Sequence, residues 1–382
     1  LRPSICCILL VIFAGSLFAG PSFKWGFQER LRHTYMNNNL DFNADRDDEQ
    51  GFFRVRTSVW GQADLNRNWA IRAQFNNEFR YYTITRQSDK DAGRENTLDE
   101  IIIEHLFLKY TTGGSDPLTI TLGRQNLMYG EGFILMDGAP WDGSRTIYHD
   151  AAKLSYQTGD MTYDFLAVSN PVYDKRLPKF RFTKEGGKYL GLPKNYEGHQ
   201  VLNDGLEEAI GLYFTKKPAG GQQMEFYYFH KMEEPQYALP PFPSISDAQK
   251  SRMSLNTVGF RLTQPIMPAL KLTTEWAIQD GKQANNKVNA YGGYANLAYT
   301  VLPAKKGVLT GGFYVLSGDD PKTAGVEGWN PLFSRWPKWS ELYIYSHTSE
   351  NIGGGRKVAY WTNTMSPNLR FDMVLNPQID LT

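Results

Sequence analysis

Apolar and polar residues alternate with a period of two in run after run of this chain. In the run 52–64, for example, Arg54 and Arg56 fall between apolar neighbours. Successive side chains of a strand point to opposite faces, so each run predicts a strand with one apolar and one polar face. The other runs are 23–35, 69–80, 101–110, 118–124, 147–156, 161–169, 207–215, 224–231, 255–263, 270–279, 288–301, 308–316 and 358–375. Helical periodicity is convincing nowhere.

The connections between these runs alternate strictly between long and short. The long polar connections lie near 37–50, 81–97, 127–146, 170–204, 232–252, 279–287 and 317–355. The short turns are 65–68, 112–115, 157–160, 217–220, 264–268, 303–306 and 376–378. This alternation is typical of a transmembrane antiparallel up-and-down β-barrel, with long extracellular loops and short periplasmic turns. We therefore expect residues 130–145 outside the cell and residues 157–160 in the periplasm.

The predicted fold class is all-β, with about 14 strands visible in the sequence. A soluble β-sandwich also alternates, but its loops need not alternate in length, and a β-propeller would show a repeat of about 40 residues that we do not find. Lipid offers no hydrogen bonds, so a barrel must close without free edges, and bacterial barrels have even strand numbers. Because residues 379–382 begin another strand, we expect several C-terminal strands of the full-length protein to be missing.

Residues 1–20 differ from the rest of the chain. Arg2 precedes an apolar run and then small residues, which is the order found in a secretory signal peptide. The alternative is a transmembrane anchor, but the apolar run is shorter than the about 20 residues of a helical span. Both cysteines, Cys6 and Cys7, lie in this segment, so the barrel domain predicted for residues 21–382 contains no disulfide.

Charged residues concentrate on the polar faces, which would line the lumen of a barrel. Removing Arg2 from the 41 basic residues leaves a number equal to the 40 acidic ones, and this balance argues against nucleic-acid binding. Parity assigns to the lumen Arg30, Arg32, Arg54, Arg56, Arg72, Arg80, Arg124, Lys153, Arg261 and Lys271, with Glu78, Asp150, Asp164 and Glu275.

An arginine-lined lumen would attract anions, because arginine keeps its charge and offers a planar fork to carboxylates. Arg124, in the Gly-Arg-Gln sequence that ends its run, is the most prominent candidate. The alternative is that the arginines and carboxylates pair with one another and fill a polar interior without selecting any solute.

Aromatic residues near strand ends and in the long connections have two interpretations. They form either a girdle at the membrane–water interface or a surface on which sugars stack at the mouth of the barrel. The residues concerned are Trp60, Tyr129, Trp141, Tyr148, Trp329, Trp336 and Trp339.

No constellation for catalysis or metal binding stands out in the sequence. The six histidines are scattered without metal-ligand spacing. There is no glycine-framed serine nucleophile and no phosphate-binding loop. We therefore expect neither an enzyme nor a cofactor or metal site.

Several stretches resemble the alginate-export family of outer-membrane porins. They are residues 53–56, 123–125, 141–151, 339–343 and 359–363. The resemblance implies a barrel of about 18 strands in the bacterial outer membrane, with a narrow arginine-rich lumen that passes an anionic polyuronate. This sequence departs from the family in lacking several C-terminal strands.

Three hypotheses of function follow from these observations. The first is an outer-membrane channel for an anionic polysaccharide or oligosaccharide, with outer-membrane lipid, lipopolysaccharide and periplasmic export components as its surroundings. The second is a structural barrel, plugged by its own loops, that sheaths a secreted partner. The third is a general diffusion porin with a preference for small anions.

Overall fold

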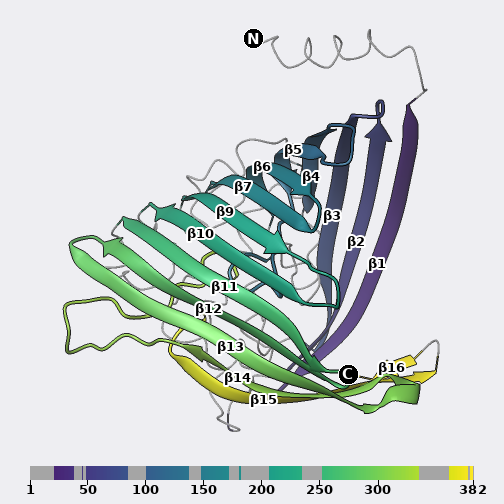
Figure 1. Ribbon diagram of the computed structural model, residues 1–382. Coiled ribbons are helices and arrows are strands. Elements are labelled where there is room, and N and C mark those ends of the chain that lie inside the picture. The colour runs from purple at the N-terminus through teal and green to yellow at the C-terminus, as the bar shows by residue number, and fades with distance from the viewer. Residues whose placement is uncertain are drawn as a thin grey trace.

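The computed structural model describes residues 21–37, 45, 49–84, 100–136, 148–171, 180–181, 206–234, 252–334, 361–376 and 379–381. Within these residues the chain forms one strongly curved antiparallel sheet, as Figure 1 shows. Its strands are β1 (Ser22–Met36), β2 (Gln50–Asp64), β3 (Trp69–Ile84), β4 (Glu100–Thr111), β5 (Leu118–Gln125), β6 (His149–Thr158), β7 (Met161–Asn170), β8 (Phe180–Arg181), β9 (Glu207–Lys216), β10 (Gln223–Glu233), β11 (Met253–Met267), β12 (Leu270–Gln283), β13 (Asn286–Leu302), β14 (Gly307–Leu316), β15 (Thr364–Asn376) and β16 (Ile379–Leu381).

Each strand pairs with the next one along the chain, apart from the two-residue β8. β7 pairs directly with β9, whereas β8 pairs with the start of β4. The predicted all-β, antiparallel up-and-down fold is confirmed, and a strand matches every predicted run. In the part of the chain described here, no pairing joins β1 to β16, so the wall is open. Closure by further strands stays a prediction.

Two predicted boundaries are wrong. Residues 279–287 do not form a long loop, because β12 and β13 continue to a tight hairpin in which Gln283 pairs with Asn286. The polar residues there still alternate along both strands, and Ala284 takes a left-handed conformation (φ 53°) that reverses the chain. The final predicted run was also too long, since β15 begins at Thr364.

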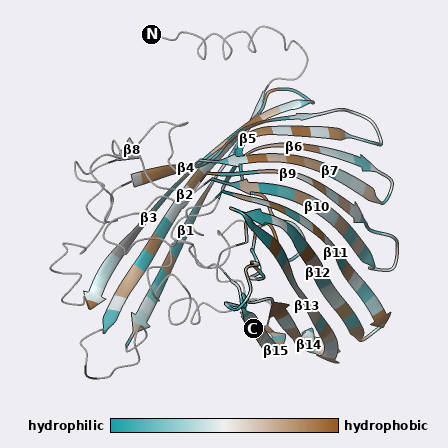
Figure 2. Ribbon diagram, turned by 90° about the vertical axis from the view of Figure 1, so that its left-hand side faces the viewer, coloured by the Kyte–Doolittle hydropathy of each residue, from teal (hydrophilic) through white to brown (hydrophobic). Residues whose placement is uncertain are grey.

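The two faces of the wall differ as the alternation predicts. On the outward face, large apolar side chains stay exposed, including Leu212 (55%), Ile278 (66%) and Met365 (77%). On the inward face, the side chains that alternate with them are largely buried, polar ones included. Figure 2 shows the resulting bands of hydrophobic and hydrophilic residues along the strands.

No helix among the described residues is long and apolar enough to cross a membrane.

Candidate functional site

The concave inner face of the wall collects most of the buried charge. The inner rows of β9 and β10 bring together Lys231, Glu207 and Glu233. The Lys231 ammonium is fully buried and lies 3.0 Å from Glu207 and 2.7 Å from Glu233. Two carboxylates around one ammonium compensate its charge where water is excluded, so this cluster holds β9 and β10 in register.

A second network surrounds Arg261 on β11. Its guanidinium donates to Glu225 at 2.6 Å and lies 3.5 Å from Glu131. Glu275 on β12 is fully buried and accepts hydrogen bonds from the hydroxyls of Tyr227 at 3.2 Å and Tyr294 at 3.0 Å. Arg261 and Glu275 therefore both lie on the inner face, within a network in which charges are locally paired.

The inner face of β1 and β2 has a different character. Antiparallel pairing sets Arg30 opposite Arg56 and Arg32 opposite Arg54. Arg54 and Arg56 are buried, at 2% and 6% exposure, and the two β1 arginines are half-buried. Like charges placed directly opposite each other destabilise a strand pair. The register thus concentrates four guanidinium groups on one region of the inner wall, here called the arginine patch.

Two segments between strands fold into the space inside the wall. The first inner segment is 126–136 and the second is 317–334. Their buried apolar residues include Leu127, Phe133, Ile134, Leu135, Met136, Trp329, Leu332 and Phe333. All of these side chains except Met136 form one hydrophobic cluster with inward residues of β7 and β9–β14. The core of the molecule is therefore inside the wall, on its concave side.

Direct contacts join the two inner segments to each other. The backbone amide of Phe333 donates to the carbonyl of Ile134 at 3.0 Å, and Leu135 and Phe333 form a parallel bridge. The rings of Phe133 and Trp329 stack with their centroids 5.2 Å apart. Aromatic pairs of this kind add to the free energy gained from burial alone.

The inner segments are also tied to the wall. The side-chain amide of Gln279 donates to the carbonyl of Asn330 at 2.7 Å and accepts from the Asn330 amide at 2.9 Å. The Tyr129 hydroxyl donates to Asp164 at 2.6 Å. Burial and the neighbouring carboxylate raise the pKa of Tyr129 well above its usual value, so this hydroxyl keeps its proton.

These positions correct two expectations. Residues 130–136 pack inside the wall and do not form an exposed polar loop, because their apolar side chains are buried against the inner face. Their expected position on the extracellular side stays a prediction, and residues 137–145 fall outside the described residues. Tyr129 and Trp329 belong to the inner core, and Trp60 packs at 4.3 Å under the Arg72 guanidinium, so none of the three is part of an interfacial girdle. Trp141, Trp336 and Trp339 fall outside the described residues.

Arg124 and Asp150 take a position that differs from the predicted one. Arg124 on β5 pairs with Leu106 of β4 and Asp150 of β6, and it shares its row with the half-exposed Leu122, two residues earlier. This row continues the outward face, whereas Lys153 belongs to the inward row. The structure therefore corrects the expected lumen position of Arg124 and Asp150.

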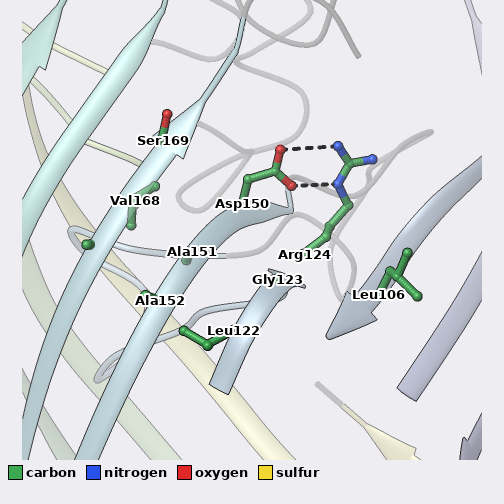
Figure 3. A pocket seen from close by; sticks show the side chains of 10 residues that line it. Leu106, Leu122, Gly123, Arg124, Asp150, Ala151, Ala152, Val168 and Ser169 are labelled. Carbon is green, nitrogen blue, oxygen red and sulfur yellow. Dashed lines mark hydrogen bonds and ion pairs between the residues drawn. The ribbon is translucent and has the colours of Figure 1, made fainter. Parts of the chain in front are cut away.

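Figure 3 shows the ion pair that these two residues form. The Arg124 guanidinium contacts both oxygens of Asp150, at 2.8 and 3.3 Å, and donates to the carbonyl of Ile103 at 3.1 Å. It also lies 4.2 Å from the centre of the Tyr148 ring. Beside the pair is an open hollow of about 450 Å³ between β4 and β7, lined by outward-row residues such as Leu122 and Ala152 and also by Gly123, Ala151 and Val168 of the inward rows.

The other predicted lumen residues have mixed positions. Lys153 lies inside and pairs with Asp164 at 2.9 Å. Arg72 lies inside and donates to the His105 ring at 3.3 Å. Lys271 is on the inward row but exposed near the β11–β12 turn. The side chains of Arg80 and Glu78 lie outside the described residues.

Sequence reasoning missed several inner-face residues. Glu104 is buried and accepts hydrogen bonds from Gln74 at 2.7 Å, from Asn126 at 3.0 Å and from Asn76. Parity within the run 101–110 does not identify Glu104 as an inner-face residue, because the register of β3 and β4 slips by one residue between Gln74 and Phe75. Lys231 and Glu207 alternate with apolar residues in the sequence, so parity could have assigned both of them to the inner face.

The fold and its two faces define a class of protein. An antiparallel wall with an exposed apolar outer face and a charged inner face is that of an outer-membrane β-barrel protein. A lipid bilayer covers such an outer face, which places the chain in the bacterial outer membrane.

Comparisons with known proteins do not refine this class. No family model matches the chain, and no curated protein matches it. Among solved structures, OmpT of Vibrio cholerae expressed in the outer membrane has a TM-score of 0.35 and 10% identity, covering 92% of this chain and 95% of that chain. The Salmonella typhi OmpF complex with daunomycin has a TM-score of 0.32 and 8% identity, covering 77% and 89%. Similarities at this level assign neither a solute nor a partner to this chain.

Proposed function

We propose that this protein is a porin-like channel that passes anionic solutes along the arginine patch. The observation that supports this most is the register of β1 and β2, which gathers Arg30, Arg32, Arg54 and Arg56 on the inner wall. The register of β2 with β3 continues this row, setting Arg80 opposite Arg54 and Glu78 opposite Arg56. The register of β12 with β13 also sets Lys282 opposite Lys287, but both are exposed at the β12–β13 hairpin, whereas the arginine patch lies on the inner wall.

The chemistry of the patch suits an anion in transit. Arginine is charged at any working pH, and its fork matches the two oxygens of a carboxylate. A low-dielectric wall strengthens the field of the clustered charges, which raises the local concentration of anions. Several neighbouring sites also allow an anion to pass from one to the next without being held too tightly.

The substrate class that fits the patch best is a carboxylate-bearing oligo- or polysaccharide. A polyuronate carries one carboxylate per sugar and could engage successive arginines of the patch. The resemblance to the alginate-export family supports this choice. Oligouronates added to one side of a planar bilayer should block the current of the protein, whereas neutral oligosaccharides of equal length should not.

A second candidate function is a barrel plugged by its own segments, which serves a structural role. The specific observation in its favour is the burial of the two inner segments, where Trp329, Leu332 and Phe333 are almost fully covered. These segments fill the space beside β7 and β9–β14 but are not part of the arginine patch. A protein that inserts into bilayers without any conductance would favour this second candidate.

The double variant Arg54→Gln/Arg56→Gln tests the proposed channel. We expect the permeability ratio of chloride to potassium, measured from reversal potentials, to fall by about threefold or more, because two of four clustered charges are removed. Arg67→Gln is the matched control, since Arg67 is exposed in the β2–β3 turn and its loss should leave the ratio unchanged. An unchanged ratio in the double variant would count against the arginine patch as the selective element.

A further inference from the structure

The short turns at one end of the wall fall into two groups by charge. Antiparallel hairpins place every second turn at the same end of a sheet, so the short turns of the described strands share one rim. The turns from β2 to β3, from β4 to β5 and from β6 to β7 each carry an aspartate in the turn or next to it, which is Asp64, Asp116 or Asp160. The turns from β9 to β10, from β11 to β12 and from β13 to β14 carry lysines and no carboxylate at these positions. One half of the rim is therefore charged differently from the other.

Four lysines of the second group reach water at the mouth of the wall. Lys217, Lys305 and Lys306 lie in the turns themselves, and Lys271 lies on the inward row of β12, next to its turn. All four are exposed. Lys216 is set apart, because it ends the outward row of β9 and its ammonium can reach the headgroups of the surrounding lipid. The other four are here called the lysine rim.

The charge of the lysine rim is not compensated within the part of the chain that the structure describes. None of its four side chains forms an ion pair there. The flanking acid Asp372 is bound to Arg370, with 2.6 Å between the charged groups. The carboxylates deeper in the wall, Glu225 and Glu275, are buried in the network around Arg261. The lysine rim therefore carries surplus positive charge.

The other half of the rim is closer to balance. Lys24, at the start of β1, pairs with Asp64 at 3.0 Å. Asp160 marks the boundary between the two halves, because its carbonyl accepts a hydrogen bond from the backbone amide of Lys217 at 2.8 Å. An anion that approaches the short turns is therefore attracted to the half formed by β9 to β14.

The spacing of the lysine rim lets its charges act together. Neighbouring hairpins are two strands apart, so their turns are separated by roughly 10 Å. This is close to the Debye length of about 10 Å at 0.1 M salt, and the fields of adjacent lysines therefore overlap in dilute salt. A lysine ammonium is a strongly hydrated charge on a flexible stem, which attracts an anion without the fixed two-point contact of an arginine. Such a surface raises the rate at which anions arrive more than the time for which they stay.

We propose that the lysine rim is the capture surface for an anionic oligo- or polysaccharide that enters from the side of the short turns. The inference rests on the proposed channel and adds to it the surface that the polymer meets before the arginine patch. A uronate chain has a carboxylate on every sugar and can engage several turns at once. Anionic lipid headgroups share this chemistry, but the lysine rim lies in the turns and on an inward row, away from the outward rows that face lipid.

Single-channel recording in a planar bilayer tests the capture surface. The probe is an oligouronate of defined length, added to either side of channels inserted in one orientation, at about 0.1 M potassium chloride. In Lys217→Gln/Lys305→Gln, the on-rate of block from one side should fall by about threefold or more, because half of the charge of the lysine rim is removed. The off-rate, and the on-rate from the opposite side, should stay at the wild-type values, since the arginine patch is intact. At about 1 M salt the difference between the variant and the wild type should disappear.

Lys282→Gln/Lys287→Gln is the matched control. Both lysines are exposed at the β12–β13 hairpin, at the opposite end of the strands, so this variant removes the same charge from another place. It should leave unchanged the on-rate that falls in the first variant. Equal loss in the two variants, unchanged on-rates in Lys217→Gln/Lys305→Gln, or an effect seen only in bilayers that contain phosphatidylglycerol would overturn the capture surface. A wild-type channel that oligouronates block from neither side would overturn the proposed channel, and the capture surface with it.

Discussion

At the scale of single residues, the ion pairs of the described chain differ widely in burial. Lys231 is fully buried between Glu207 and Glu233, and its ammonium also donates to the Leu332 carbonyl at 2.8 Å. Lys287 instead makes an exposed pair with Asp280 at 3.8 Å. Removing one partner of a buried pair leaves an uncompensated charge, whereas an exposed pair contributes little.

Lys231→Met should lower the free energy of unfolding by about 3–5 kcal/mol, because two carboxylates lose their counter-ion in a site that excludes water. Urea unfolding in detergent micelles, followed by tryptophan fluorescence, measures this change. The control Lys287→Met should stay within about 1 kcal/mol of the wild type. Similar effects of the two variants would show that the burial of Lys231 has no energetic consequence.

Gly123 is the residue whose backbone places Arg124. Its φ of 122° is one that side-chain-bearing residues rarely adopt, and a Cβ there would collide with the carbonyl oxygen of Leu106. Gly123→Ala should therefore cost about 1–3 kcal/mol of stability, measured by the same unfolding curves. Gly113→Ala, in a turn where an added Cβ meets nothing within 4 Å, should cost less than about 0.5 kcal/mol. A neutral Gly123→Ala would contradict the described approach of β5 to β4.

The position of Arg124 also shows where residue-level prediction failed. The assignment of Arg124 to the lumen by parity was wrong on the sequence itself, because Leu118, Ile120 and Leu122 share its parity and set it in an apolar row. The Gly-Arg-Gln context and the charge favoured the lumen, but at a strand end the guanidinium can turn back onto Asp150 and the Ile103 carbonyl. The alternation of apolar and polar residues does not predict a buried ion pair at the edge of an apolar face.

At the scale of elements, the strands were predictable and the inner segments were not. Alternation over ten residues predicts a strand without any knowledge of the strands that pair with it. The register of β1 with β2 then runs without a break along both strands, from Ser22 opposite Asp64 to Met36 opposite Gln50. Residues 126–136 have no period, and their glycines and polar neighbours look like those of an exposed loop. Only the pairing of Leu135 with Phe333, almost 200 positions later (roughly, by sequence number), gives the apolar side chains a place to be buried.

A cross-link tests this contact between the inner segments. In the variant Leu135→Cys/Phe333→Cys, we expect a disulfide to form under mild oxidation, because bridge partners lie within the reach of a disulfide. Tryptic peptides analysed by mass spectrometry report the cross-link. Leu135→Cys/Leu369→Cys is the control, since Leu369 is exposed on the outward face and should not react with position 135. Absence of the first cross-link would contradict the inner position of both segments.

At the scale of the whole molecule, the wall separates two environments. Its outer face exposes Ile278 and Ile266, at 66% and 51%, and its inner face carries the arginine patch and the charged networks. Ile278 lies well inside β12, whereas Ile266 is next to the β11–β12 turn. A charge on the outer face should therefore cost more at position 278 than at position 266.

Ile278→Lys should lower the stability in lipid vesicles by about 2–4 kcal/mol, and Ile266→Lys by at most about 1 kcal/mol, because the cost of a lysine falls toward the membrane surface. Reversible unfolding in guanidinium chloride from vesicles gives both values. Equal, small effects at the two positions would show that water and not lipid covers the outer face.

The reversal potential of the wild-type protein in a planar bilayer tests the central claim most directly. Under a gradient of potassium chloride, a channel lined by the arginine patch should give a potential whose sign marks chloride as the more permeant ion. The preference should weaken as the salt concentration rises and screens the guanidinium groups. A potential of zero, a preference for potassium, or insertion without any current would contradict the account.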